Sequence, residues 1–348
     1  MARSDHGPHR LTVAAVHVET DDAVSFELTV PPELEDKFHY QPGQYCSIAV
    51  TIDGEQVRRS YSLSSSPALG EPFTLTVKRV PEGRLSNWLA DHVVAGDPFD
   101  LTAPAGTFVL RDRGTPLVAF AAGSGITPIF GVLKTALALT ERRVRLLYAN
   151  RNDRSVIFGA KLAHLQEQYP DRFDLALHSD DDSSFLTQES CVTFLGTDAD
   201  ADVYICGPSA FMDLAETAAV AAGVPAENIL IERFDDAPPE VGGGGEDSAD
   251  DEDGGILATE VEIRLRGSKN TFTYHRGDTI LGAARRNGLN PPYSCQLGGC
   301  GTCMAMLVEG AVFMHQNDTL DDDEIEEGWT LTCQAVPTTP RVVVDYEA

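Results

Sequence analysis

The sequence has few positive charges for its length. Its 348 residues include 26 Lys and Arg against 54 Asp and Glu, which gives a formal net charge of −28 at pH 7. Such a surface repels the phosphates of nucleic acids and the head groups of anionic membranes, so neither is an expected partner. A protein partner with a basic docking patch would be attracted to it, although solubility alone explains part of the acidity.

Long apolar runs are also missing. The longest, at residues 117–122, is far shorter than a membrane-spanning helix requires. Residues 1–10 are not followed by the apolar segment of a signal peptide. Three of the seven cysteines, Cys46, Cys191 and Cys206, are scattered and indicate no disulfide framework. We therefore expect a soluble cytoplasmic protein, and we expect it to be a monomer.

The other four cysteines form one pattern near the C-terminus. Cys295, Cys300 and Cys303 follow a C-x4-C-x2-C spacing, and Cys333 stands thirty residues further on. A [2Fe-2S] cluster needs four thiolates, and this spacing is that of the plant-type ligand set. We expect these four cysteines to bind such a cluster.

Glycines separate the cysteines of this loop. Gly298, Gly299 and Gly301 lack side chains, so the backbone can turn its N–H groups toward the cluster sulfurs. A zinc site with four cysteine ligands is the alternative, although zinc ribbons usually contain two separated C-x2-C pairs. A disulfide pair is the second alternative.

Residues 1–112 are expected to form an antiparallel β-barrel. Alternating or clustered apolar and β-branched residues predict strands near residues 11–18, 24–30 and 73–77. The turn signals between the strands are Pro31-Pro32, Asp53-Gly54 and the stretch from Pro81 to Gly83.

One strand of this barrel has the composition of a flavin site, with Arg59, Ser60, Tyr61 and Ser62 in succession. The guanidinium can bind a phosphate, the tyrosine ring can cover the isoalloxazine, and the Ser62 hydroxyl can reach the flavin N5. Because Tyr and Ser are common in strands, an ordinary structural strand is the alternative.

A second segment adds a phosphate site to this hypothesis. A glycine turn precedes a predicted helix start, where backbone N–H groups can bind a pyrophosphate. The residues we assign to it are Val77, Lys78, Arg79, Gly83, Leu85 and Ser86.

Residues 113–235 change to a Rossmann-like α/β pattern. The apolar run at 116–121 predicts a buried parallel strand, and a helix is expected at 129–139. The turn between them is typical of a dinucleotide site, with proline in place of a third glycine. Its candidate binding residues are Gly123, Ser124, Gly125, Thr127 and Pro128.

The α/β alternation continues along this segment. Strands are expected at 144–148, 173–177 and 203–206, and helices at 160–168 and 210–222. Cys206, Gly207 and Pro208 end a strand, so they should lie at the same carboxyl edge of the sheet as the glycine turn. A plain buried thiol is the alternative for Cys206.

Residues 236–255 are acidic and glycine-rich, which predicts a disordered linker. Residues 256–348 then predict a compact β-grasp domain around the cysteine loop. Its expected elements are a hairpin of strands 257–265 and 271–274 across residues 267–270, a helix at 280–287 capped by Asp278 and ended by Gly288, and a strand at 304–308.

The order of these motifs resembles the flavin-dependent ferredoxin–NAD(P)H reductase family with a C-terminal plant-type ferredoxin domain. The resemblance covers nearly the whole chain apart from the linker and the N-terminal tail. It implies that Arg59 to Ser62 hold the flavin, that Gly123 to Pro128 hold the nicotinamide dinucleotide, and that Cys206 lies beside the nicotinamide. It further implies that Glu232 and Phe234 lie near the flavin ring.

The resemblance implies an electron-splitting reductase. NADH would give a hydride to FAD, and single electrons would pass through the cluster to a terminal oxygenase. Ser62, Cys206 and Glu232 are the expected catalytic residues. Arg151 and Arg154 are candidates for binding the 2′-phosphate of NADPH, but Asp153 between them would repel it, so we expect NADH.

Within the family, residues 148–159 and 169–172 are most similar to the reductase component of 3-ketosteroid 9α-hydroxylase, which serves a Rieske oxygenase. The reductase of phenylacetyl-CoA epoxidase is the second match. Both imply FAD rather than FMN. The alternative of another class is a non-catalytic zinc-binding or redox-sensing protein.

Overall fold

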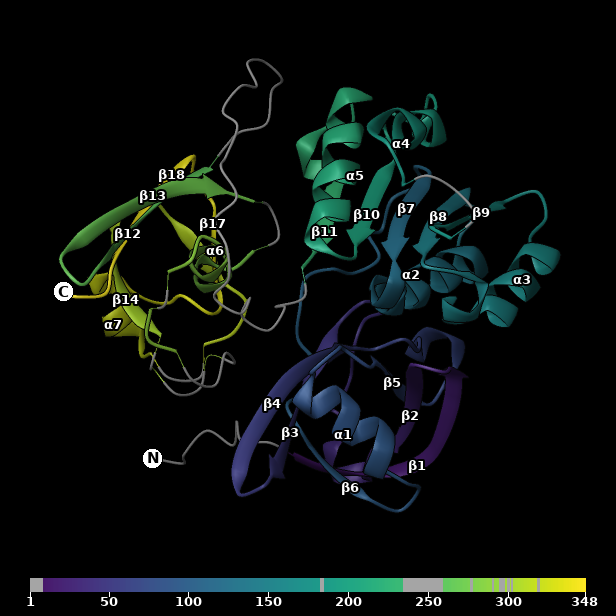
Figure 1. The fold of residues 1–348 in the computed structure, drawn as a ribbon, viewed down its shortest axis with the longest axis horizontal. Coiled ribbons are helices and arrows are strands. Elements are labelled where there is room, and N and C mark those ends of the chain that lie inside the picture. The colour runs from purple at the N-terminus through teal and green to yellow at the C-terminus, as the bar shows by residue number, and fades with distance from the viewer. Residues whose placement is uncertain are drawn as a thin grey trace. The chain divides into compact units, whose positions relative to one another are not determined.

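The computed structural model describes residues 9–181, 185–233, 259–275, 278–289, 291–293, 298, 301, 303–317 and 320–348. The chain divides into two compact units, Asp5–Phe234 and Asp235–Ala348 (Figure 1). The predicted linker at 236–255 lies outside the described residues. Among those that are described, no helix is long and apolar enough to cross a lipid bilayer.

The first sheet of unit 1 confirms the predicted antiparallel barrel. Its six strands follow the order β4-β3-β6-β1-β2-β5, and a bridge between Leu63 and Leu75 joins the two ends. Leu11 and Val13 show why the chain forms strands here, since both are buried while Thr12 between them is exposed. The strands are β1 (His9–Thr20), β2 (Ala23–Thr29), β3 (Tyr45–Ile52), β4 (Glu55–Ser62), β5 (Phe73–Lys78) and β6 (Pro98–Leu101).

Tight turns and one helix complete the barrel domain. Asp53 and Gly54 both have positive φ and join β3 to β4, which confirms that predicted turn. Helix α1 (Arg84–His92) contacts β4 and β5 and buries Leu85 and Leu89 in the barrel core. Short 3₁₀ helices lie at η1 (Pro32–Leu34) and η2 (Pro67–Leu69).

The second sheet of unit 1 is parallel, as the α/β pattern predicted. Its order is β11-β10-β7-β8-β9, and all six residues of the central strand β7 are buried. Helices α2 and α3 pack on one face and α4 and α5 on the other, so β7 needs apolar side chains on both sides. The strands are β7 (Leu117–Ala122), β8 (Val144–Asn150), β9 (Phe173–Ser179), β10 (Asp202–Cys206) and β11 (Ile229–Glu232).

The helices of this sheet begin slightly earlier than the sequence predicted. Helix α2 starts at Ile126, directly after a 3₁₀ turn of Gly123 to Gly125, so the first helical turn includes Pro128. Helix α4 and strand β11 were not predicted. The helices are α2 (Ile126–Leu139), α3 (Gly159–Gln168), α4 (Gln188–Leu195) and α5 (Ser209–Ala221), with 3₁₀ helices η3 (Gly123–Gly125), η4 (Asp153–Ser155) and η5 (Ala226–Asn228).

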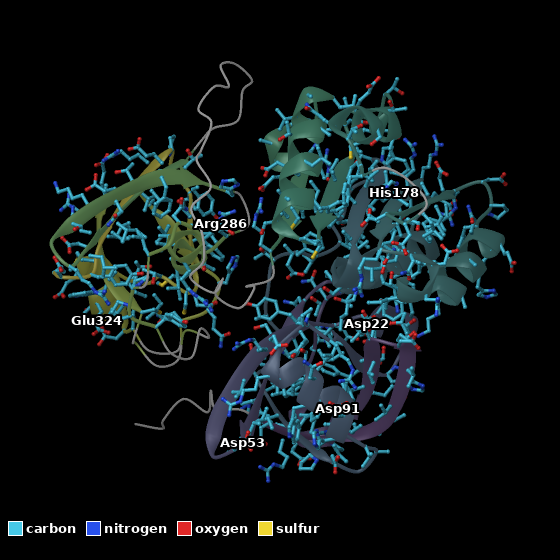
Figure 2. The ribbon with its side chains drawn as sticks, viewed as in Figure 1. Asp22, Asp53, Asp91, His178, Arg286 and Glu324 are labelled. Carbon is cyan, nitrogen blue, oxygen red and sulfur yellow. The ribbon has the colours of Figure 1, made fainter. Side chains whose placement is uncertain are left out.

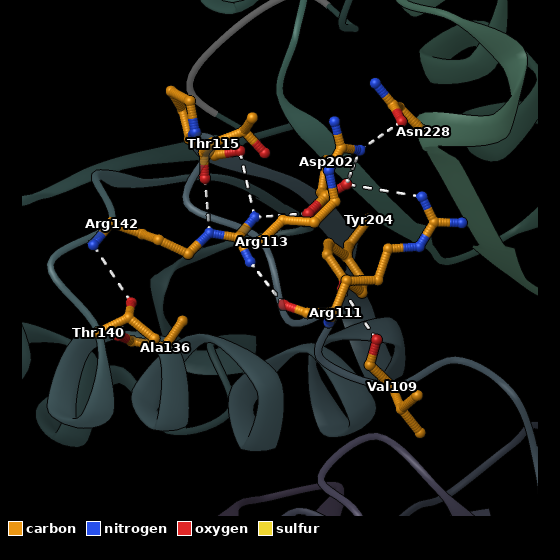
Figure 3. Close-up of polar contacts among 11 residues, drawn as sticks. Val109, Arg111, Arg113, Thr115, Ala136, Thr140, Arg142, Asp202, Tyr204 and Asn228 are labelled. Carbon is orange, nitrogen blue, oxygen red and sulfur yellow. Dashed lines mark hydrogen bonds and ion pairs between the residues drawn. The ribbon is translucent and has the colours of Figure 1, made fainter.

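A buried ion cluster holds the amino edge of this parallel sheet (Figure 3). Asp202 is fully buried and accepts hydrogen bonds from Arg142 at 2.7 Å and Arg113 at 2.8 Å. Arg142 also donates to the backbone carbonyls of Thr115 and Arg111. The cluster therefore joins β10 to the segments that precede β7 and β8.

Ion pairs and hydrogen bonds fix the barrel against the parallel sheet. Lys134 of α2 lies 2.5 Å from Glu71, and Lys161 of α3 lies 2.8 Å from Glu19 of β1. Gly131 of α2 packs so closely that an added Cβ would lie 3.2 Å from the Ser65 carbonyl oxygen. The two domains of unit 1 are thus in direct contact.

Unit 2 is a mixed sheet with the order β13-β12-β18-β14-β16, in which only the β12–β18 pair is parallel among the pairings described. Together with α6, this is the arrangement of the expected β-grasp domain. Its elements are β12 (Thr259–Leu265), β13 (Ser268–Tyr274), α6 (Ile280–Arg286), β14 (Met304–Glu309), β15 (Val312–Met314), α7 (Asp322–Glu327), β16 (Trp329–Leu331), β17 (Ala335–Pro337) and β18 (Arg341–Asp345).

Two local predictions in unit 2 were wrong. The hairpin turn is not residues 267–270 but the shorter pair Arg266 and Gly267, both at positive φ, because Leu265 pairs directly with Ser268. The cap of α6 is Thr279, whose hydroxyl accepts from the Gly282 N–H at 3.0 Å, rather than Asp278.

Candidate functional site

The ends of two strands from different sheets meet in unit 1. Ser62 is the last residue of β4 in the barrel, and Glu232 is the last residue of β11 in the parallel sheet. The Ser62 hydroxyl donates a hydrogen bond of 3.4 Å to a Glu232 carboxyl oxygen, across 170 positions of sequence. Cys206 pairs with Glu232 in the β10–β11 register, so all three predicted catalytic residues come together.

Burial controls the charge of this group of side chains. It raises the pKa of Glu232 to about 8, although the hydrogen bond from Ser62 opposes the shift. Burial also raises the pKa of the Cys206 thiol well above its ordinary value, and the neighbouring Glu232 raises it further. At neutral pH both groups are therefore predominantly protonated and uncharged.

The glycine turn and the Cys206 turn are in close contact at the carboxyl edge of the sheet. A Cβ added to Gly125 would lie 2.0 Å from the Cys206 carbonyl oxygen, and one on Gly207 would lie 2.9 Å from the Ala122 Cβ. Thr127 is buried and donates to the Ser124 carbonyl at 2.9 Å, which fixes the turn. This edge is where open α/β sheets bind their ligands.

Pro128 lies in the first turn of α2 and Pro208 precedes the first residue of α5. Both helices therefore begin at this same edge, with their free N–H groups directed toward it. A backbone lined by glycines and helix starts suits a dinucleotide pyrophosphate.

Lys78 lies where the two domains of unit 1 meet. We expect it to bind a flavin phosphate, and its Nζ is 3.3 Å from the position of a Cβ on Gly123, in the nicotinamide half of unit 1. Burial lowers the pKa of this ammonium, while Asp22 opposes the change. A cation beside the glycine turn can serve an anionic ligand of either domain.

The predicted flavin strand divides its side chains between two faces. Alternation places Arg59 and Tyr61 on one face of β4 and Ser60 and Ser62 on the other. Burial raises the pKa of Tyr61, which keeps its hydroxyl protonated, and the Ser60 hydroxyl lies 2.8 Å from that of Ser47.

Other predicted flavin ligands are engaged within the barrel. Arg79 forms an ion pair of 2.5 Å with Asp91 of α1, and the buried Ser86 hydroxyl accepts from the Val80 N–H at 3.2 Å. Val77 and Leu85 are buried in the core, so only their backbone can face a ligand. A Cβ on Gly83 would lie 2.5 Å from the Ser86 hydroxyl oxygen, which explains the glycine before the helix.

Unit 2 holds a pair of buried thiols. Cys303 and Cys333 are both almost fully buried, and the hydrogen bond between them lowers the pKa of Cys303 to about 7. The Thr332 hydroxyl donates to the Cys303 carbonyl at 2.8 Å and lies 2.7 Å from the Tyr346 hydroxyl. Two adjacent buried thiols suit a thiolate-bound cluster.

The glycine loop agrees with this interpretation. Gly298 and Gly301 both have positive φ, and a Cβ on Gly298 would lie 2.6 Å from the Gln316 carbonyl oxygen. Cys295, Cys300 and the predicted flavin neighbour Phe234 lie outside the described residues.

Asp22 and Asn150 lie near the glycine turn although the sequence analysis did not single them out. Asp22 contacts Arg151 of the other domain, a contact across 129 positions. Asn150 ends β8 beside the glycine turn. The register of β7 and β8 places Asn150 there, and the packing of the two domains brings Asp22 to Arg151.

Three family models match successive parts of the chain. They describe an oxidoreductase FAD-binding domain at residues 10–110, an oxidoreductase NAD-binding domain at 120–217 and a 2Fe-2S iron-sulfur cluster binding domain at 263–338. Fold and site together therefore define a nicotinamide-dependent flavoprotein oxidoreductase with an iron–sulfur domain. The third match supports the cluster rather than the zinc alternative.

The chain belongs to the family of monooxygenase ferredoxin reductase components. It is 36% identical to the ferredoxin reductase component of 3-ketosteroid-9-alpha-monooxygenase from Rhodococcus rhodochrous, over 97% of this chain and 96% of that protein. It is 35% identical to one component of the 1,2-phenylacetyl-CoA epoxidase from Escherichia coli, over 98% of each.

A solved structure agrees with this family. Phthalate dioxygenase reductase matches with a TM-score of 0.56 and 25% identity, over 99% of this chain and 100% of that one. That protein transfers electrons from pyridine nucleotides to a [2Fe-2S] cluster.

Proposed function

We propose that this protein takes electrons from NADH and delivers them, through FAD and a [2Fe-2S] cluster, to a terminal oxygenase. The supporting observation is that Ser62 of the flavin domain meets Glu232 and Cys206 of the NAD domain at one place. A bound flavin accepts a hydride and releases electrons singly, and the cluster accepts them one at a time.

In this proposal Ser62, Cys206 and Glu232 surround the point of hydride transfer. Because burial keeps the Glu232 carboxyl and the Cys206 thiol protonated, they place no negative charge where a hydride must arrive. The Glu232 carboxyl also retains a proton within reach of the Ser62 hydroxyl. Both side chains thus contribute a neutral, hydrogen-bonding environment.

We assign the remaining residues by domain. Phe234 would lie near the flavin ring, and the flavin would be held by Arg59, Ser60, Tyr61, Ser62, Val77, Lys78, Arg79, Gly83, Leu85 and Ser86. The coenzyme would be held by the glycine turn and by Gly207 and Pro208. Cys295, Cys300, Cys303 and Cys333 would bind the cluster, and the domains would be 1–112, 113–235 and 256–348, with a linker at 236–255.

An anaerobic titration with NADH tests this function. We expect the flavin absorbance to bleach and low-temperature EPR of the reduced sample to give a rhombic [2Fe-2S] signal. Protein prepared with adequate iron and FAD that shows no visible chromophore would contradict the proposal. Bleached flavin without an EPR signal would contradict only the electron route to the cluster.

For the partner, we propose the Rieske-type oxygenase of a 3-ketosteroid 9α-hydroxylase. The identity of 36% to the corresponding reductase component supports this choice. The second candidate is a phenylacetyl-CoA epoxidase, because the relative from that system is 35% identical over nearly its full length.

Reconstitution decides between these two partners. The reductase is mixed with each purified oxygenase and its substrate, and product formed per NADH oxidised is measured. We expect about one product formed per NADH oxidised with the steroid oxygenase and much less with the epoxidase. The opposite result would overturn this choice of partner. We further propose a monomer that acts in the cytoplasm, where NADH is available, and sedimentation analysis tests the monomeric state.

A further inference from the structure

A buried amide with weak hydrogen bonding borders the glycine turn. Asn150 is only 5% exposed, and within the described residues its side chain interacts with the Tyr148 hydroxyl, where it acts to lower the pKa of that group, but neither amide atom forms a hydrogen bond of good geometry. A buried polar group left in this state costs free energy, so a ligand that satisfies it would gain affinity. The hydroxyl of Tyr148, on the same face of β8, donates to the Gly123 carbonyl at 2.9 Å and accepts from the Ile157 N–H, so Asn150 faces the same region.

A carboxylate from the flavin domain reaches the same region. Asp22 lies in the two-residue turn between β1 and β2, at the end of the barrel that faces the parallel sheet (Figure 2). It accepts a hydrogen bond from the Arg151 guanidinium at 2.8 Å and lies 3.8 Å from the Lys78 ammonium. Asp22 therefore contacts both Arg151 and the lysine that lies beside Gly123.

The position of these residues indicates which part of a dinucleotide they would meet. In dinucleotide-binding folds, an acid about 20 residues beyond the glycine turn binds the adenosine ribose 2′-hydroxyl, or an arginine there accepts a 2′-phosphate. In this chain the corresponding position is the end of β8, where Asn150 follows Gly125 by 25 residues and Arg151 comes next. The acid that usually binds the ribose is therefore replaced by an amide there. Asp22 supplies a carboxylate to this strand end from the other domain.

We propose that Asn150 and Asp22 bind the adenosine ribose diol of NADH, and that Asp22 excludes NADPH by holding Arg151 in an ion pair. A carboxylate accepts from a hydroxyl, and an amide can both donate to and accept from one, so the pair matches a vicinal diol. A 2′-phosphate would instead face the Asp22 charge and find Arg151 already paired. This inference rests on the proposed function.

Further acids surround the same arginine. Asp181 accepts a hydrogen bond of 3.1 Å from the Asn152 amide, and its own N–H donates to the Arg151 carbonyl. Asp153 begins η4 two residues after Arg151. Their charges add to the repulsion that a 2′-phosphate meets, which strengthens the preference for NADH.

Asp22→Asn tests the specificity in the intact holoprotein. We expect the ratio of kcat/KM for NADPH to that for NADH to rise by about tenfold or more, the size of one charge-assisted hydrogen bond. Glu71→Gln is the matched control, because it neutralises another carboxylate that pairs with the NAD domain, through Lys134. A ratio that rises equally in both variants, or in neither, would overturn the proposal.

Adding Arg151→Ala to Asp22→Asn tests the second half of the inference. If the released guanidinium binds the 2′-phosphate, the gain for NADPH disappears in the double variant. A gain that persists without Arg151 would show that the arginine has no part in the discrimination.

Asn150→Leu tests the ribose contact by binding rather than turnover. We expect the Kd of 5′-AMP, measured by calorimetry, to rise about fivefold or more, while cooperative thermal unfolding shows that the variant is still folded. Unchanged AMP affinity would overturn the role of Asn150. If NADH reduces the wild-type protein but Asp22→Asn and Asn150→Leu do not differ from it in coenzyme preference or AMP affinity, this inference is wrong. The proposed function would then still hold.

Discussion

Glu232 shows how a single residue connects the site to the stability of the fold. Its ordinary pKa of 4.5 is raised to about 8 by burial, so the folded state binds a proton that the unfolded chain has lost at intermediate pH. The stabilisation from this proton is therefore complete below about pH 4.5 and disappears as the pH rises through about 8. A neutral glutamine at the same position would not titrate.

We predict that Glu232→Gln makes flavin-free protein relatively more stable at high pH. The free energy of unfolding of wild type should fall, relative to the variant, between pH 5 and pH 8.5. Urea unfolding at the two pH values measures the difference. Glu227→Gln, which changes an exposed glutamate nearby, should show no such trend, and a trend equal to that of Glu232→Gln would contradict the assignment.

The buried ion cluster around Asp202 stabilises the parallel sheet of unit 1 as a whole element. Arg142 is 3% exposed, and removal of the Asp202 charge would leave its guanidinium buried without a counter-ion. We predict that Asp202→Asn destabilises unit 1 by about 3–5 kcal/mol, measured by urea unfolding.

An exposed ion pair provides the control for this prediction. Asp100 pairs with Arg10, whose side chain is 70% exposed, so Asp100→Asn should cost less than about 1 kcal/mol. If the free energy of unfolding fell equally in Asp202→Asn and Asp100→Asn, burial of the ion pair would not determine its contribution to stability.

The contact between the two turns at the sheet edge gives another element-scale prediction. Gly125→Ala would place its Cβ 2.0 Å from the Cys206 carbonyl oxygen, which is backbone and cannot move independently. We expect a lower Tm and at least a tenfold weaker Kd for NAD⁺, since the helix start would shift. Gly114→Ala, where an added Cβ meets nothing within 4 Å, should leave both quantities within experimental error.

Elements that carry a strong local signal could be predicted from the sequence. The apolar run of β7, the glycine turn after it and the alternation in β1 each gave the correct element, and the ordered motifs gave the three kinds of domain. Strand β11 was missed because four residues are too few to show a period. The α6 cap was misplaced because Thr279 and Asp278 are both good caps and only the backbone decides between them.

The site itself could be predicted only in part. Each motif indicated its own ligand, but the contact of Ser62 with Glu232 and that of Asp22 with Arg151 depend on how two domains pack. Lys78 is assigned to the flavin from its motif in the barrel, and that motif did not indicate that its side chain also reaches the glycine turn of the other domain. Long-range packing of this kind leaves no local pattern.

At the scale of the whole molecule, the chain consists of two units with separate cores. Among the residues that the structure describes, the buried apolar side chains of unit 1 form three clusters, and those of unit 2 form two others that share no residue with them. Each unit therefore has the means to fold alone.

We predict that separate proteins of residues 1–235 and 256–348 each fold and bind their own cofactors, but exchange electrons slowly. A tether gives an effective concentration of about 1 mM for short flexible linkers, far above the micromolar concentrations of an ordinary mixture. In stopped-flow measurements under anaerobic conditions, reduction of the cluster by NADH should be first order and independent of concentration in the intact chain. In the mixture the rate should rise linearly with the concentration of the second fragment. Equal rates in the intact chain and in a micromolar mixture would mean that the two units associate tightly without the connection.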